Sequence, residues 1–311
     1  MNYRSLGTSG LKVSAIGLGT NQFGGKVDAK TTKNILHAAL DLGINFIDTA
    51  DVYQAGRSEE YIGLALEGRR QGAVIATKVY YKVGEGPNDR GASRQHILDS
   101  VENSLRRLNT DYLDLYQIHM WDEETPIEET MRALEDLAQT GKVRYIGASN
   151  FNAWQLVWSN ALAEINGWTK FVSIQPHYHM LERDIERELM PACTYFGIGI
   201  LPYFPLAGGF LTGKYQIDQP APPGSRGVSS EYVQRYMKPE NYSKLEKLKA
   251  FAKEHNRTLG ELAHAWLLAQ PQISSVISGA TSIEHVQANA AAADWELTEE
   301  EIYQVNMILE T

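Results

Sequence analysis

The sequence contains little cysteine and no long apolar run. Cys193 is the only cysteine among 311 residues, so no intrachain disulfide can form. It lies in an apolar helical stretch, residues 189–196, where we expect a buried, inert thiol. No segment approaches the roughly 18 apolar residues of a membrane-spanning helix, and the opening residues, MNYRSLGTSG, lack the apolar core of a signal peptide. These absences predict a soluble, cytoplasmic protein.

Positive charge is also scarce. The chain has 29 Lys and Arg against 38 Asp and Glu, a formal net charge of -9. Nucleic acids and anionic membranes bind proteins through clustered Lys and Arg. We therefore expect neither as a partner. The sequence gives no indication of the oligomeric state.

Short apolar runs alternate eight times with longer helical patterns. Most runs are nearly continuous in Val, Ile, Leu and Ala, as in strands buried on both faces of a parallel sheet. The predicted strands are residues 15–19, 45–48, 73–78, 113–119, 143–149, 172–175, 199–203 and 275–279.

Helix caps separate these strands. Asp28 and Ser93 are expected N-caps, and Thr125 and Thr258 each begin a capping box. Two further features frame the eight units: a β-hairpin over residues 3–13, and a connection of more than thirty residues after the seventh strand, from Tyr203 to about Glu240. So long a loop is usually functional. We predict an α/β fold in which residues 1–311 form one (β/α)8 TIM barrel, with this loop over its C-terminal mouth.

An open, doubly wound sheet is the alternative fold. Gly17 and Gly19 begin a dinucleotide-binding fingerprint, but Gln22 stands where the third glycine belongs. The fingerprint also requires a helix start that this loop does not offer. This disfavours the open sheet.

Four polar residues follow neighbouring strands of the predicted barrel. Asp48, Lys78 and His119 end the second, third and fourth strands, and Tyr53 lies in the loop after the second. A free tyrosine has a pKa of about 10, and a nearby ammonium favours the phenolate and so lowers that pKa. Asp48 is expected to pair with Lys78, and His119 to orient a carbonyl or share the proton. Each residue alone is more often structural, but together they suit proton delivery to a carbonyl oxygen.

Longer motifs give these residues a family context. The chain resembles the aldo-keto reductases over nearly its whole length, and it is most similar to bacterial reductases related to potassium-channel β subunits. The matching motifs are DTADVYQAGRSEEYIGLAL (48–66), ATK (76–78), LDLYQIHMWD (113–122), KVRYIGASNF (142–151), QPHYHMLER (175–183) and YFPLAGGFLTGKY (203–215).

The resemblance implies a nicotinamide cofactor and positions that contact it. Asp48, Tyr53, Lys78 and His119 match the catalytic tetrad, with Asp48 also beside the cofactor. The other implied cofactor contacts are Gly19, Thr20 and Asn21 at the nicotinamide end; Ser149, Asn150 and Gln175 on its carboxamide; Tyr203 stacked on its ring; Leu206, Gly208, Lys214 and Arg226 along the diphosphate; and Gly279, Thr281, Ser282, His285 and Asn289 at the adenosine phosphate.

The segment 279–289 departs from the family pattern. Many members place Lys or Arg there to pair with the 2′-phosphate of NADP, whereas this chain offers Thr281, Ser282, His285, Gln287 and Asn289 instead. Without a fixed cation, discrimination against NAD should weaken. NADP(H) is favoured, and NAD(H) is possible.

The predicted substrate pocket is apolar and holds no metal. We expect Phe23, Tyr53, Met120, Trp121 and residues of the 204–240 loop to line it, which favours aldehydes or ketones with hydrophobic parts. His177 and His179 lie beside Glu182, but we expect the two histidines to point to opposite faces. No cysteine or aspartate cluster completes a coordination shell there.

The leading hypothesis is thus an NADP(H)-dependent oxidoreductase that reduces aldehydes or ketones, with Tyr53 as general acid. A cofactor-binding regulatory or redox-sensing protein with slow turnover is the alternative. A third reading is a cofactor-free lyase or isomerase that uses Lys78 as a Schiff base.

Overall fold

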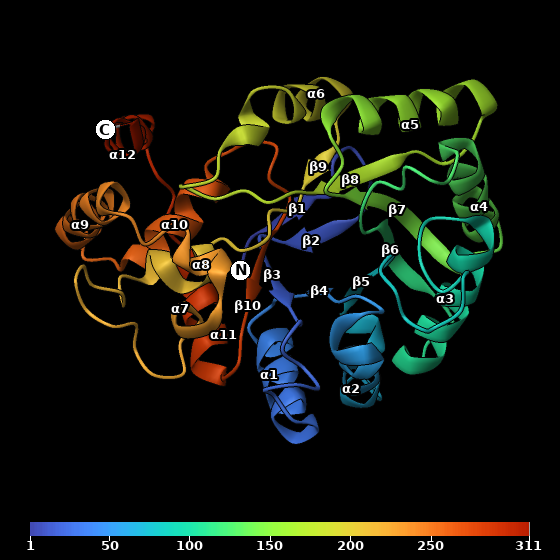
Figure 1. Ribbon diagram of the computed structural model, residues 1–311, viewed down its shortest axis with the longest axis horizontal. Helices are drawn as coiled ribbons and strands as arrows, with labels where there is room; N and C mark the ends of the chain where they lie inside the picture. The colour runs from blue at the N-terminus through green and yellow to red at the C-terminus, as the bar shows by residue number, and fades with distance from the viewer. Residues whose placement is uncertain (311) are drawn as a thin grey trace.

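Eight parallel strands form the centre of the computed structural model, which describes residues 1–310 (Figure 1). Their order is β10-β3-β4-β5-β6-β7-β8-β9, and parallel bridges from Ile200 to Ile273 and from Tyr203 to Ile277 join the two ends of this row. The predicted (β/α)8 barrel is confirmed. The strands are β3 (Ile16–Gly19), β4 (Phe46–Asp48), β5 (Val74–Val79), β6 (Leu113–Ile118), β7 (Val143–Ser149), β8 (Phe171–Gln175), β9 (Gly199–Ile200) and β10 (Val276–Gly279).

The seventh barrel strand is shorter than predicted. We expected residues 199–203, but β9 ends at Ile200. Pro202 has no N–H to donate to a neighbouring strand. Its carbonyl still accepts a hydrogen bond from the Ile277 N–H at 2.9 Å, so the chain stays beside β10 without forming a regular ladder.

Helices surround the sheet and follow the predicted alternation. Asp28 caps the first of them by accepting from the Thr31 N–H, and Ser93 and Thr258 cap α3 and α10 as predicted. The helices are α1 (Ala29–Asp41), α2 (Arg57–Ala65), α3 (Arg94–Leu108), α4 (Ile127–Gln139), α5 (Ala153–Asn166), α6 (Leu189–Phe196), α7 (Arg226–Ser229), α8 (Glu231–Gln234), α9 (Pro239–Glu254), α10 (Leu259–Leu268), α11 (Ile283–Ala292) and α12 (Glu299–Glu310). Among residues 1–310, no helix is both long enough and apolar enough to span a bilayer.

One predicted cap is wrong. Thr125 does not cap α4, because Pro126 occupies the N-cap position and the helix begins at Ile127. The Thr125 hydroxyl instead donates to Asp122 at 2.7 Å. This bond holds the hydroxyl within the loop that precedes the helix.

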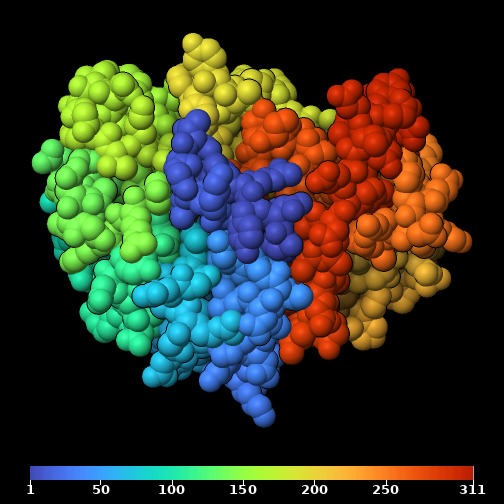
Figure 2. Space-filling view, turned by 180° about the vertical axis from the view of Figure 1, so that it is seen from behind, coloured from blue at the N-terminus to red at the C-terminus, as the bar shows by residue number. Residues whose placement is uncertain are grey.

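The predicted hairpin closes the N-terminal end of the barrel. Strands β1 (Tyr3–Ser5) and β2 (Lys12–Ser14) pair antiparallel, and Figure 2 shows this dark-blue segment at the centre of one face. Leu6 and Val13 are fully buried against the barrel interior, in a cluster with Phe46 and Leu115. A larger apolar layer fills the space between the strands and the helices.

The long loop lies at the opposite end, as predicted. It contains a 3-10 helix, η4 (Ala207–Thr212), followed by α7 and α8. The Tyr232 ring of α8 lies 5.1 Å from the rings of His177 and Phe204, which follow β8 and β9. The loop therefore covers the carboxyl ends of these strands, where barrel active sites are built.

Candidate active site

Asp48 and Lys78 meet at the carboxyl ends of β4 and β5. Lys78 Nζ donates to Asp48 Oδ2 and to the Thr49 carbonyl, both at 2.8 Å. Burial lowers the pKa of Lys78, but the neighbouring Asp48 and Tyr53 outweigh it and leave this pKa raised. The ammonium therefore stays charged at neutral pH, as predicted.

Tyr53 lies beside this ion pair on an unusual turn. Lys78 Nζ is 3.4 Å from the Tyr53 hydroxyl. Gln54 and Ala55, directly after it, both have a positive φ, 52° and 56°. Residues other than glycine rarely adopt this backbone conformation. Such strain persists where the surrounding structure enforces it, commonly at functional sites. Here Gln54 Nε2 donates to the Asn21 carbonyl at 3.0 Å, which ties the turn to the loop after β3.

The pKa of Tyr53 differs from the prediction. Burial raises it, and the charge on Lys78 acts in the opposite direction without cancelling that effect. We expected the lysine to dominate. The phenol consequently keeps its proton at neutral pH, which is the form that a proton donor needs.

His119 completes the group from the end of β6. Its ring is 6.0 Å from that of Tyr53 and 4.8 Å from that of Tyr81. Burial, with the charge of Lys78, lowers the pKa of His119 to about 2. Nδ1 is buried and has no hydrogen-bond partner among the described residues. A neutral imidazole of this kind suits the orientation of a carbonyl better than the supply of a proton.

Three features of this site were absent from the sequence predictions. Tyr81 packs on His119, the Thr49 carbonyl binds Lys78, and Asp51 lies close by, with both carboxylate oxygens buried and without a side-chain hydrogen bond to any residue of 1–310. Burial and then Glu59 raise the pKa of Asp51 to about 8. The position of Asp51 in the segment DTADVY was the one available signal.

Residues of the loop after β3 lie against the tetrad. Gly19 pairs with Asp48 across β3 and β4. Thr20 is fully buried, and its hydroxyl donates to the Asp48 carbonyl at 2.8 Å. The Asn21 carbonyl holds the turn after Tyr53. The residues predicted to contact the nicotinamide end thus lie against the tetrad. The Thr20 hydroxyl is already hydrogen-bonded within the protein.

The residues predicted for the carboxamide form one network. Ser149 Oγ donates to the Gln175 carbonyl at 2.8 Å, and Gln175 Nε2 donates to Asp48 Oδ1 at 2.8 Å. Asn150 Nδ2 donates to the His119 carbonyl at 3.1 Å and accepts at Oδ1 from the Tyr203 hydroxyl at 3.0 Å. The network connects four strand ends to the tetrad and offers the mixed donors and acceptors that an amide requires.

Two predicted diphosphate ligands are cations without counter-ions. Lys214 and Arg226 pair with no carboxylate within residues 1–310, although the chain is acidic overall. Arg226 lies over the Phe204 ring, and burial lowers its pKa. Burying an unpaired charge is costly, so an anion beside the half-buried Arg226 would stabilise it, whereas Lys214 is exposed.

The remaining diphosphate positions, Leu206 and Gly208, precede both cations in the chain. Leu206 directly precedes η4. Gly208, inside η4, has φ +66°, and a Cβ there would stand 2.5 Å from Val233, so only glycine fits. The conformation of this loop, and the approach of Val233 to it, therefore depend on glycine at position 208.

The segment predicted to contact the adenosine phosphate forms the start of α11. Ser282 caps the helix by accepting from the His285 N–H, and the Thr281 hydroxyl lies 3.2 Å from His285 Nδ1. Asn289 donates to the carbonyl of Gly279, at the end of β10. The helix N-terminus favours phosphate, but the segment carries an exposed glutamate, Glu284, and no Lys or Arg.

The predicted pocket wall is partly wrong. Phe23 has no exposed surface and belongs to the core between strands and helices, so it does not face the mouth. Its side chain is turned inward, and its backbone bridges to Val27. Met120 and Trp121 are half-buried beyond β6, where they can line a pocket.

His177 and His179 do not point apart as we expected. Their rings are 4.8 Å from each other, because residues two apart on an extended chain lie on the same face. His177 also stacks on Tyr203, at 5.2 Å and 15°. The pair thus supports the aromatic ring that we predicted to contact the nicotinamide.

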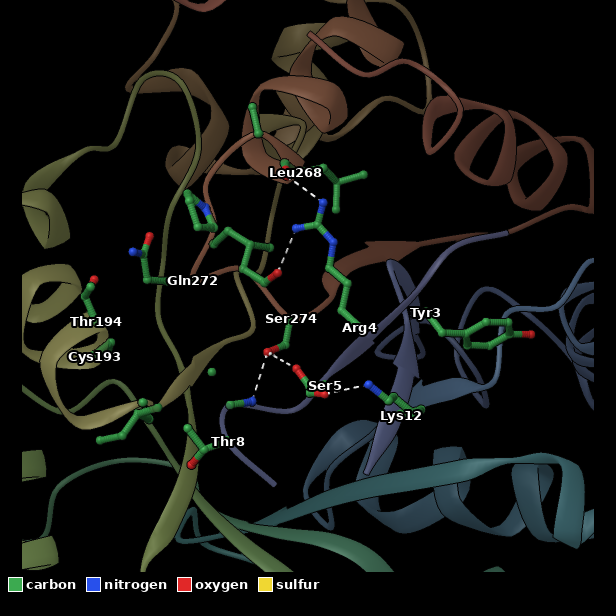
Figure 3. Close-up of a pocket in the computed structure, with 17 residues that line it drawn as sticks. Tyr3, Arg4, Ser5, Thr8, Lys12, Cys193, Thr194, Leu268, Gln272 and Ser274 are labelled. Carbon is green, nitrogen blue, oxygen red and sulfur yellow. Dashed lines mark hydrogen bonds between the residues drawn. The ribbon is translucent and has the colours of Figure 1, made fainter. Parts of the chain in front are cut away.

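A hollow of about 710 Å³ lies far from these groups, under the N-terminal hairpin (Figure 3). Arg4, Ser5 and Ser274 line it, and Arg4 donates to the carbonyls of Leu268 and Ile273. None of the tetrad lies there. This is the end of a barrel that usually serves stability rather than chemistry.

Comparison with known proteins agrees with the geometry. A sequence model described as the aldo/keto reductase family matches residues 15–310. The chain belongs to the aldo/keto reductase family. It is 40% identical to a probable voltage-gated potassium channel subunit beta of Arabidopsis thaliana, over 94% of this chain and 92% of that protein.

Two other relatives carry enzyme names. An uncharacterized oxidoreductase of Bacillus subtilis, YrpG, is 38% identical over 99% of this chain and 96% of its own length. A putative aryl-alcohol dehydrogenase of Schizosaccharomyces pombe is 35% identical over 96% and 93%. The resemblance, including the branch related to channel β subunits, is confirmed. The chain is an oxidoreductase of a family that generally uses NAD(P)H.

Proposed function

We propose that this aldo/keto reductase is an NADP(H)-dependent enzyme that reduces aldehydes or ketones to alcohols, with Tyr53 as general acid. One observation carries the proposal. At the barrel mouth, Lys78 Nζ stands 2.8 Å from Asp48 and 3.4 Å from the Tyr53 hydroxyl. This arrangement can deliver a proton and stabilise the anion that remains.

The bound nicotinamide would supply a hydride to the carbonyl carbon. Tyr53 would donate its phenolic proton to the carbonyl oxygen. Lys78 would stabilise the resulting phenolate by its charge, while Asp48 holds the ammonium in place. His119, neutral at physiological pH, would orient the carbonyl oxygen toward Tyr53.

The raised pKa of Lys78 disfavours the Schiff-base reading. A lysine nucleophile must lose its proton near neutral pH, commonly by burial without a counter-ion. Lys78 is buried, but Asp48 keeps the ammonium protonated. A lyase or isomerase that uses Lys78 covalently is therefore a poor fit.

The preference for NADP(H) rests on the start of α11. The helix N-terminus at α11 and its hydroxyl groups support phosphate binding. The missing cation and the exposed Glu284 leave NAD(H) as a possible second cofactor. Side-by-side titration with NADPH and NADH measures the ratio of the two dissociation constants, and tighter binding of NADH would overturn the preference.

A second candidate function is a cofactor-holding redox sensor with slow turnover. The observation that favours it is the 40% identity to a relative named as a potassium channel subunit. Cofactor that stays bound through purification, with negligible turnover of a broad carbonyl panel, would support this alternative over the enzyme.

The test of the proposed function is Tyr53→Phe, with the exposed Tyr303→Phe as matched control. NADPH oxidation with an aromatic aldehyde should fall by about 10²-fold to 10⁴-fold in Tyr53→Phe and stay at the wild-type rate in the control. Cofactor affinity, followed by fluorescence, should hardly change in either. Near-normal turnover by Tyr53→Phe would show that the assigned mechanism is wrong.

A further inference from the structure

Two tryptophans meet at the rim of the barrel mouth: Trp121, which the sequence predicted to line the pocket, and Trp154, which it did not. The rings of Trp121 and Trp154 are 5.4 Å apart at 63°. Trp121 follows His119 by two residues, so their Cα atoms are at most about 7 Å apart. Trp154 is the second residue of α5. It follows Asn150, which donates to the His119 carbonyl, by four residues. The contact therefore bridges the loops after β6 and β7, next to the tetrad.

Packing and hydrogen bonds hold Trp121 in place. It packs edge to face on Phe151 at 5.2 Å, and Phe151 packs in the same way on Phe171 of β8. The neighbouring Asp122 accepts hydrogen bonds from the Ala92 N–H and the Thr125 hydroxyl, both at 2.7 Å. These bonds tie the loop to the segment before α3. The first indole is thus held in one place before any ligand arrives.

The backbone at Trp154 is held in place, but its side chain is largely exposed to solvent. Asn152 and Gln155 form a capping box that sets the start of α5. The Trp154 side chain nevertheless leaves 61% of the residue's surface exposed. A large apolar ring held still and left in water is suited to stack against another flat ring. Trp158, one turn further along α5, is 45% exposed and has no ring contact with Trp121 among the described residues.

We propose that Trp154 is a specificity-determining residue that stacks on the distal aromatic ring of a two-ring carbonyl substrate. The inference rests on the proposed reductase function. With the reacting carbonyl at Tyr53 and His119, the first ring of the substrate lies beside Trp121. A second, linked ring then reaches the exposed face of Trp154. Carbonyl compounds without a second flat ring do not use this contact.

Matched substrates and variants test this assignment. The substrates are para-phenylbenzaldehyde and para-cyclohexylbenzaldehyde, which are similar in size and apolar surface but differ in the flatness of the distal ring. We expect wild-type enzyme to prefer the phenyl compound in kcat/KM by about threefold to tenfold. Trp154→Ala should bring this ratio close to one, Trp154→Phe should keep part of it, and Trp158→Ala should leave it at the wild-type value.

Two results would overturn the assignment: a wild-type ratio near one, or an equal loss for both substrates in Trp154→Ala. A binding measurement separates it from the proposed function. In Tyr53→Phe saturated with NADP⁺, calorimetry of para-phenylbenzyl alcohol should show weaker binding when Trp154→Ala is added, again by about threefold to tenfold. If no aldehyde is turned over but this difference persists, the reductase proposal fails and the stacking site stands. If the difference is absent, the stacking site fails.

Discussion

The ammonium of Lys78 lies 2.8 Å from Oδ2 of Asp48, and the two side chains are 0% and 3% exposed. A buried pair of this kind gives little net stability, because desolvation of both charges offsets their attraction. It is, however, expensive to break. The same contact therefore links the stability of the barrel to the chemistry at its mouth.

Removal of one partner should cost more than removal of both. Lys78→Met leaves Asp48 buried without its cation, and we expect it to lower the free energy of unfolding by about 3–5 kcal/mol. The double variant Lys78→Met, Asp48→Leu should recover part of this loss, while turnover is lost in both. Urea unfolding followed by circular dichroism measures the difference. Equal destabilisation in the two variants would contradict this view of the pair.

Asp51 should make the protein less stable as pH rises. Its pKa is about 8 in the folded protein, against about 4 when unfolded. Between these values the unfolded chain loses its proton while the folded chain keeps it. The stabilisation is therefore complete below about pH 4 and falls as pH rises toward 8.

Asp51→Asn cannot ionise and should remove this dependence. Relative to wild type, we expect its free energy of unfolding to rise by roughly 1–3 kcal/mol more at pH 8 than at pH 5. Urea unfolding at the two pH values gives the comparison, with the exposed Asp111→Asn as control. A pH-independent difference between Asp51→Asn and wild type would show that the carboxyl is already ionised in the folded state.

Lys214 and Arg226 should contribute to cofactor affinity through charge. Each lacks a carboxylate partner in the described part of the chain, and a hydrogen bond to a charged group contributes about 1.5–3 kcal/mol. Lys214→Met and Arg226→Met should each weaken NADPH binding by about tenfold or more, with a smaller effect at high salt. Lys33→Met, an exposed change on α1, controls for net charge. If all three variants bound NADPH alike, the two cations would not contact the diphosphate.

The sequence by itself determined the barrel and the gathering of four polar side chains at its mouth. Strands buried on both faces are continuous apolar runs, so their positions are readable without a structure. Since the carboxyl ends of parallel strands lie at one mouth of the barrel, the sequence alone predicts that the residues after them lie close together. Asp48, Tyr53, Lys78 and His119 were found in this way.

Only the tertiary structure decided which side chains touch and how their proton affinities respond. The burial that raises the pKa of Tyr53 against the pull of Lys78, the inward turn of Phe23, and the contact of Trp121 with Trp154 all depend on how separate loops pack when the barrel closes. Desolvation and packing are properties of the whole surroundings of a group. A linear pattern records the identity of neighbours in the chain, but not of those in space.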